Sequence, residues 1–139
     1  MINDNNSRKK VLLVDDDEIH LEITELALKD EYEIFIANSG REALEFLNEG
    51  KNIPDLILLD LIMPMMDGWT VFEKIQDIAA FKFTPIIFYT SLDEESAVEK
   101  AYELGVFDYV TKPCDQSVLL MKINDALQKA ELKKQHYGI

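Results

Sequence analysis

The chain has 139 residues, of which 47% are apolar, and its 27 acidic and 14 basic side chains give a formal net charge of −13. This length suits one domain with a buried core, and the apolar content argues against disorder. No apolar run approaches the ~20 residues of a membrane span, and the acidity disfavours nucleic acid as a partner. The polar first ten residues do not resemble a secretory signal, and the single cysteine excludes an internal disulfide, so we expect a cytoplasmic protein.

Five short apolar runs, mostly β-branched or aromatic, are typical of strands buried on both faces. In chain order they lie at Val11–Val14, Ile34–Ile36, Leu56–Leu59, Ile86–Tyr89 and Val106–Val110. A segment with helical spacing follows each run, so strand and helix alternate five times. This alternation predicts an α/β fold in which a doubly wound, five-stranded parallel sheet carries helices on both faces.

The first three helices are predicted from apolar spacing and from end signals. Ile19, Ile23 and Leu26 repeat in the first helix as a core-facing stripe would. The second helix begins with a capping box formed by Ser39 and Glu42. The third begins after Gly68, and we expect its inner face to consist of Val71, Phe72 and Ile75.

The last two helices have similar signals. Helical spacing links Ala97, Ala101 and Leu104 in the fourth, which Gly105 ends as a C-cap glycine. Asp115 can cap the last helix, whose apolar residues are Leu119, Ile123 and Leu127 and which we expect to end around Lys133. We therefore predict one domain over residues 8–134, with flexible tails at residues 1–7 and 135–139.

Polar side chains stand at the carboxyl ends of four predicted strands, where open parallel sheets bind their ligands. These residues are Asp15, Asp16, Asp17, Asp60, Thr90, Ser91 and Lys112. Each alone is weak evidence, since an acid after a strand is more often a helix cap. Even without Asp17 and Ser91, they place three carboxylates, a hydroxyl and an ammonium on one edge.

This combination of groups predicts phosphoryl chemistry. Clustered carboxylates repel one another unless a cation lies among them, and a small oxygen-ligand site suits Mg²⁺. A metal, the Lys112 ammonium and the Thr90 hydroxyl match the dispersed negative charge of a phosphoryl group. The remaining carboxylate, Asp60, is then free to act as a nucleophile.

From Lys10 to Leu132 the chain resembles the receiver domain of two-component response regulators. The resemblance rests on "VLLVDDDE", "PDLILLDLIMPMMDGW", "PIIFYTS" and "AYELGVFDYVTKP", which occur in order and at the family's spacing. It implies a flavodoxin-like (βα)5 fold with strand order 2-1-3-4-5. It also implies that Asp60 is the phosphoacceptor and that Mg²⁺ is held by Asp15, Asp16, Asp60 and the main-chain carbonyl of Ile62.

The resemblance assigns the remaining site residues as well. Thr90 and Lys112 would each bind a phosphoryl oxygen, and a cis Lys112–Pro113 bond would aim the ammonium inward. Thr90 and Tyr109 would form the switch that changes the surface of helix four, strand five and helix five, around residues 97–102 and 115–120. The family's polar residues that position the hydrolytic water correspond here to Ile62 and Leu92, so we expect slow loss of the phosphoryl group.

The implied function is a phosphorylation-controlled signalling switch rather than an enzyme with an external substrate. Its partners would be a sensor histidine kinase or a histidine phosphotransfer protein, and a separate downstream protein, with no nucleic acid or membrane. An aspartate-nucleophile phosphohydrolase using Asp15 is the main alternative, but it leaves Asp60 without a role. A dinucleotide site is disfavoured because the loop "DDDEIH" has no glycine and three negative charges. A receiver that only docks proteins is disfavoured by the intact site.

Six other residues of chemical interest are interpreted as structural. His20 is expected on the exposed side of the first helix, and a metal or phosphohistidine role for it is disfavoured. Trp69 and the three methionines of the loop after Asp60 are expected to pack there, and Cys114 is expected to be a small packed residue. The methionines are Met63, Met65 and Met66.

Overall fold

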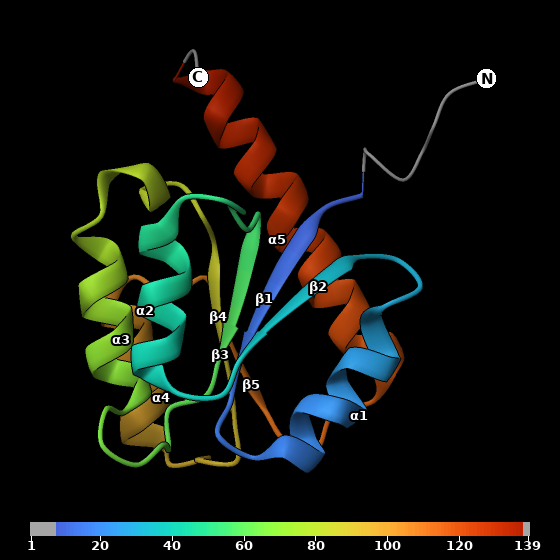
Figure 1. Cartoon of the computed structure of the whole chain (residues 1–139), viewed down its shortest axis with the longest axis vertical. Helices are drawn as coiled ribbons and strands as arrows, with labels where there is room; N and C mark the ends of the chain where they lie inside the picture. The colour runs from blue at the N-terminus through green and yellow to red at the C-terminus, as the bar shows by residue number, and fades with distance from the viewer. Residues whose placement is uncertain (1–7, 138–139) are drawn as a thin grey trace.

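The computed structural model describes residues 8–137, in which strands and α-helices alternate five times. The strands pair in parallel in the order β2-β1-β3-β4-β5 (Figure 1), which confirms the predicted doubly wound, flavodoxin-like sheet. No helix of the described part is long and apolar enough to cross a membrane. The elements are β1 Lys10–Val14, α1 Glu18–Leu28, β2 Glu33–Ala37, α2 Gly40–Glu49, β3 Leu56–Leu59, α3 Gly68–Gln76, the 3-10 turn η2 Ala79–Phe81, β4 Ile86–Thr90, α4 Glu95–Leu104, β5 Asp108–Thr111 and α5 Gln116–His136.

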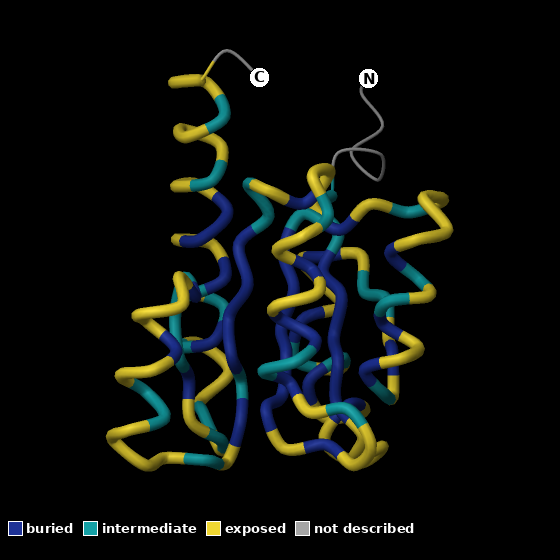
Figure 2. Tube along the Cα trace, turned by 90° about the vertical axis from the view of Figure 1, so that its left-hand side faces the viewer, coloured by how far each residue is buried: buried dark blue, intermediate teal, exposed yellow. Residues whose placement is uncertain are grey.

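The sheet is covered on both faces, and each face has its own core. Because successive side chains of a strand point to opposite faces, Leu12 and Val14 of β1 pack with α2, α3 and α4, whereas Val11 and Leu13 pack with α1 and α5. Figure 1 shows these two helical layers, and Figure 2 shows the buried strands between them. Val14, Leu59 and Thr90, the last residues of β1, β3 and β4, are buried, which gives the side chains at these strand ends a rigid base.

The predicted core face of α1 is wrong. Ile19, Ile23 and Leu26 are 69%, 59% and 59% exposed, whereas Leu21, Thr24 and Leu28 are buried. Both sets have helical spacing, so periodicity alone does not decide between them. The Asp17 side chain caps the helix by accepting hydrogen bonds from the backbone N–H groups of Ile19 (2.9 Å) and His20 (3.2 Å), and this fixes where the helix begins. Leu21 and Leu28 then pack in the core that contains Val11 and Leu13 of β1.

The predicted cap of α4 is confirmed, and it explains why β5 begins later than expected. Gly105 has a φ of +101°, the left-handed conformation that favours glycine. The N–H of Val106 donates to the Ala101 carbonyl (3.1 Å). This hydrogen bond closes the end of α4, so the Val106 N–H does not pair with β4. The strand consequently begins at Asp108 instead of Val106. Ala101 is buried as predicted, but Leu104 is 42% exposed.

The other helix ends agree with the sequence in part. The Ser39 hydroxyl accepts the Glu42 N–H (3.0 Å), while the Glu42 carboxylate accepts the N–H of Asn38 (2.8 Å) rather than that of Ser39. Asp115 occupies the N-cap position of α5, but its side chain makes no capping hydrogen bond. The predicted inner faces of α3 and α5 are buried as expected.

Helix α5 is longer than predicted. It continues beyond Lys133 to His136, and Tyr137 then stacks on Phe83 with ring centroids 5.5 Å apart. This aromatic contact anchors the last turn, where a frayed tail was expected. Residues 1–7 and 138–139 of the predicted tails lie outside the described residues, so the boundaries 8–134 stay a prediction.

Candidate functional site

Strand ends bring the predicted site residues to one edge of the sheet. Asp15, Asp60 and Thr90 are only 7%, 8% and 0% exposed. Two backbone bonds hold the acids in place, from the Asp15 N–H to the Ala37 carbonyl (3.2 Å) and from the Asp60 N–H to the Val14 carbonyl (2.9 Å). Both carboxylates therefore extend from rigid strand ends instead of from mobile loops.

Lys112 joins the two buried carboxylates. Its ammonium donates to Asp15 Oδ2 and lies 3.2 Å from Asp60 Oδ2. Its backbone N–H donates to the Thr90 carbonyl (2.8 Å), and the Lys112–Pro113 bond is cis, as expected. Burial alone would lower the pKa of Lys112, but its hydrogen bonds to Asp15 and Asp60 and their charges outweigh burial and raise that pKa. The site thus holds a fixed positive charge directly beside Asp60.

Three carboxylates at this edge fit a hard cation. Asp15, Asp16 and Asp60 each offer an oxygen, and these atoms all lie within 4.8 Å of one another. Burial raises the pKa of Asp15, although the hydrogen bond from Lys112 opposes this shift. A set made only of carboxylate oxygens suits Mg²⁺. The N–H of Ile62 donates to Asp60 Oδ1 (3.2 Å), so this residue begins the loop directly beside the acid.

The loop after Asp60 requires glycine at position 68 for reasons of space. A Cβ on Gly68 would lie 2.2 Å from the Asp60 carbonyl oxygen and 2.7 Å from Leu61 Cα. The N–H of Gly68 donates to the Leu61 carbonyl (2.9 Å), and the Asp67 carboxylate caps α3 at the Thr70 N–H (3.0 Å). Helix α3 therefore begins in direct contact with the backbone of Asp60.

Replacing Gly68 with Ala is expected to destabilise the protein by about 3 kcal/mol, the upper end of the usual cost of overpacking. The added methyl group must displace the backbone of Asp60. Gly50→Ala is the matched control, because Gly50 has a φ of +72° and nothing lies within 4 Å of its added Cβ. Its strain should cost only about 1 kcal/mol. Urea unfolding measures both, and equal losses of stability would contradict the proposed clash.

Thr90 and Tyr109 are linked through Leu92, which lies in the loop after β4. The Thr90 hydroxyl accepts the N–H of Leu92 (3.3 Å), and the Tyr109 hydroxyl donates to the Leu92 carbonyl. The Tyr109 ring meets the buried Phe88 ring edge-on, with centroids 6.2 Å apart. A change at Thr90 therefore has a short physical route to Tyr109.

His20 is the site neighbour that sequence reasoning missed. Its side chain is exposed, as expected, yet its Nδ1 lies 3.5 Å from the Lys112 ammonium and 3.9 Å from Asp15 Oδ2. It also lies 3.6 Å from an Asp17 carboxylate oxygen, three residues earlier on the same turn. This helical spacing after the acidic run was the available signal.

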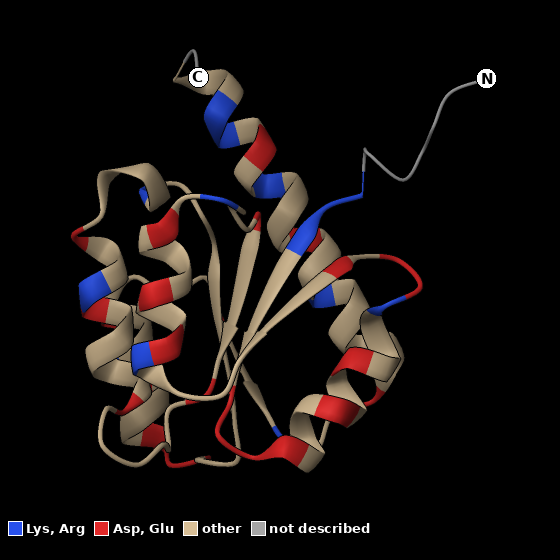
Figure 3. Cartoon of the chain, viewed as in Figure 1, with Lys and Arg blue, Asp and Glu red and all other residues tan. Residues whose placement is uncertain are grey.

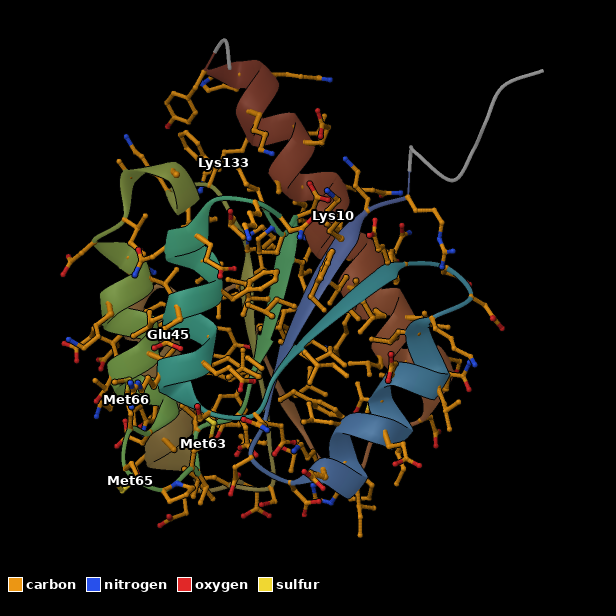
Figure 4. All side chains as sticks on the ribbon, viewed as in Figure 1. Lys10, Glu45, Met63, Met65, Met66 and Lys133 are labelled. Carbon is orange, nitrogen blue, oxygen red and sulfur yellow. The ribbon has the colours of Figure 1, made fainter. Side chains whose placement is uncertain are left out.

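The loop methionines differ among themselves. Met63 is buried and Met66 is partly buried against the same core, so both pack as expected. Met65 does not, since its side chain is fully exposed and its φ is 70°. Figure 4 labels these three side chains in the loop after Asp60. Trp69 packs edge-on against Phe88 (5.4 Å), as predicted. Burial raises the pKa of the Cys114 thiol, which agrees with a packed residue of low reactivity.

Comparisons with known proteins agree with this geometry. A family model described as the response regulator receiver domain matches residues 11–124. The response regulator PleD of Caulobacter vibrioides is 32% identical over 140 residues, which cover 94% of this chain. The chain spans only 30% of the length of that relative.

Solved structures give the same result. A crystal structure of a putative response regulator from Chloroflexus aurantiacus matches with a TM-score of 0.81 and 32% identity, covering 87% of this chain and 98% of that one. The chemotaxis protein CheY4 of Vibrio cholerae matches with a TM-score of 0.79 and 28% identity, covering 86% and 98%. The similarity in fold therefore extends over most of this chain.

Proposed function

Because the chain belongs to the response regulator receiver domain family, we propose that it is a signalling switch controlled by phosphorylation of Asp60. A receiver domain is a regulatory signalling domain, and this membership disfavours the phosphohydrolase and dinucleotide alternatives. The observation that carries the proposal is the buried pairing of Asp60 with Lys112, at 3.2 Å, beside two further carboxylates.

The site residues have complementary roles in this proposal. An Asp60 carboxylate oxygen attacks phosphorus as the bond to the donor breaks, which gives an aspartyl phosphate. Lys112 and the Thr90 hydroxyl each bind a phosphoryl oxygen and stabilise the charge on the transferred group. Bound Mg²⁺, held by Asp15, Asp16, Asp60 and the Ile62 carbonyl, would neutralise phosphoryl charge. The domain would thus catalyse its own phosphorylation and dephosphorylation.

Incubation with Mg²⁺ and acetyl phosphate tests this proposal most directly. We expect the mass of one phosphoryl group to be added per chain, and peptide mass spectrometry to place it at Asp60. Omitting Mg²⁺ should abolish the addition. Addition at Asp15, or at any residue outside this edge, would overturn the assignment.

Mg²⁺ alone is expected to stabilise the protein, because the cation binds the folded carboxylate cluster and relieves its repulsion. At a concentration about 100 times Kd, the expected gain is about 2.7 kcal/mol, measured as a rise in Tm. Asp16→Ala should lose this gain. Asp93→Ala is the matched control, since Asp93 is an exposed carboxylate outside the cluster. A rise in Tm that persists in Asp16→Ala would contradict the proposed ligand set.

The exposed apolar stripe of α1 supports a protein as the phosphodonor. Ile19, Ile23 and Leu26 extend from the turn that follows the acidic run, and Ile23 and Leu26 border a recess of about 340 Å³ beside the start of α5. Apolar side chains that collect on one helix face are typical of protein interaction sites. We propose that a histidine kinase or histidine phosphotransfer protein docks here in the cytoplasm, with its phosphohistidine directed at Asp60.

The surface formed by α4, β5 and α5 is the proposed output, and it acts on a separate protein rather than on nucleic acid or membrane. A polar network joins its three elements through Asp108 of β5. The Tyr102 hydroxyl of α4 donates to Asp108 Oδ1 (2.9 Å), and the Lys122 ammonium of α5 lies 3.2 Å from Asp108 Oδ2. A shift of Tyr109, the neighbour of Asp108, would therefore alter the polar contacts that Asp108 makes with both helices.

Beryllofluoride, a phosphoryl mimic, is expected to bias this surface between two pre-existing states. Amide chemical shifts should move at residues 97–102 and 115–120 and stay constant in α2, the internal reference. Trp69, the single tryptophan, provides a second readout, because its ring lies against Phe88 and 4.3 Å from the Lys100 ammonium of α4. Tyr109→Ala should reduce the fluorescence change. Unmoved shifts on the output surface would contradict this route.

A further inference from the structure

A second hollow lies far from Asp60, at the opposite edge of the sheet. It is a groove of about 850 Å³ between the η2–β4 connection, the end of α4 and the last turns of α5. Figure 4 shows Lys133, which lines it, at one end of the molecule and the loop with Met63 and Met65 at the other. Its volume is that of clefts that bind small organic molecules.

The floor of the groove is apolar and the walls are aromatic. Buried side chains from α3, η2, β4 and the segment before β5 form the floor: Phe72, Ile75, Phe81, Ile86 and Val106. Phe83 and Phe107 line the walls and are only partly covered. The Phe83 ring stacks on Tyr137, with an interplanar angle of 23°, and this contact joins the two walls. A flat apolar group would bury its faces here.

The charges of the groove are opposite to those of the whole chain. Lys82, Lys129, Lys133 and His136 line it, and none of its lining residues is Asp or Glu. Within residues 8–137, neither Lys82 nor Lys133 has an ion-pair partner, whereas Lys129 is paired with Asp125 (3.4 Å). Figure 3 shows basic residues on the protruding end of α5, in a chain whose net charge is −13.

We propose that this groove is a second binding site, for a small organic anion that carries an aromatic ring. The ring would lie against the apolar floor and the Phe83 and Phe107 side chains, and the anionic group would pair with the ammonium groups of Lys82 and Lys133. Helix α4 ends at the groove with its partly negative carbonyls, which places the anion on the side of Lys133. A polyanion is disfavoured because the chain as a whole would repel it.

The first test is a fluorescence titration of the full chain with 8-anilinonaphthalene-1-sulfonate, an aromatic anion. We expect saturable one-to-one binding and weaker binding of the neutral N-phenyl-1-naphthylamine. Lys133→Glu combined with Lys82→Glu should weaken sulfonate binding by about tenfold or more. Lys134→Glu makes the charge change of Lys133→Glu one residue away and outside the groove, so it should change Kd less than about twofold.

Two further measurements locate the bound probe and identify the chemical class of ligand that the groove prefers. Amide shifts should move around Phe83, Phe107 and Lys133 and stay constant around Asp60, and each variant should still unfold cooperatively. Displacement by AMP would assign the site to nucleotide phosphates, and displacement by indole-3-acetate to aromatic carboxylates. The proposal would be overturned if neither compound displaced the probe, or if the neutral probe bound as tightly as the sulfonate. It would also be overturned if Lys134→Glu weakened sulfonate binding as much as the double variant does.

Discussion

Replacing Asp60 with Asn is expected to abolish phosphoryl transfer from acetyl phosphate, with labelling reduced at least about a thousandfold, which corresponds to about 4 kcal/mol of lost transition-state stabilisation. The amide is nearly the same size as the carboxylate, and its oxygen can still accept the Ile62 N–H. What is lost is the nucleophile itself and its charge opposite Lys112. The rate of labelling, followed by intact-mass spectrometry, measures the effect.

The control for this variant is Asp77→Asn. Asp77 is an exposed carboxylate at the C-terminal end of α3, outside the site, so the same chemical change should leave labelling intact. Asp60→Asn should also unfold cooperatively, because Lys112 keeps its pairing with Asp15. Undiminished labelling of Asp60→Asn would show that another residue accepts the phosphoryl group.

The sheet was predictable because its strands are buried on both faces. Such strands appear as short apolar runs, and the alternation with helical segments then restricts the topology. The site was predictable for a related reason, because parallel strands place their carboxyl ends at a single edge. Asp15, Asp60, Thr90 and Lys112 therefore met in space even though they are up to 97 residues apart.

The errors occurred where local pattern does not determine tertiary contact. In α1 two apolar sets have helical spacing, and the Asp17 cap and the packing against β1 and α5 select Leu21 and Leu28. The contact between Gly68 and the Asp60 backbone was not predictable, because a glycine after Asp67 reads as a turn residue in sequence. His20 was missed because it lies in the first turn of α1 and not at a strand end, so the parallel sheet alone does not bring it to Lys112.

The lifetime of the phosphoryl group is the second large effect that we predict. Hydrolysis of an aspartyl phosphate requires a water molecule in line with the phosphorus–oxygen bond. The two residues that correspond to the family's water-positioning side chains are Ile62 and Leu92. Ile62 is 54% exposed, whereas Leu92 is half-buried against the α2–α3–α4 side of the core. Neither side chain can orient or polarise water, so we expect a half-life of hours.

Ile62→Asn is the sharper of the two tests, since Ile62 is the more exposed and its removal leaves the core intact. An amide that holds the water should speed dephosphorylation by about tenfold, which corresponds to about 1.4 kcal/mol of barrier. Ile53→Asn makes the same change in the α2–β3 loop at nearly equal exposure, 53%, and should leave the half-life unchanged.

Leu92→Glu should add to the effect of Ile62→Asn. Loss of phosphate from the labelled protein in Mg²⁺ buffer gives each rate, and a wild-type half-life of seconds would refute the claim. Such a stable aspartyl phosphate would make the output surface a slow switch, which a separate phosphatase or back-transfer to a histidine would have to reset.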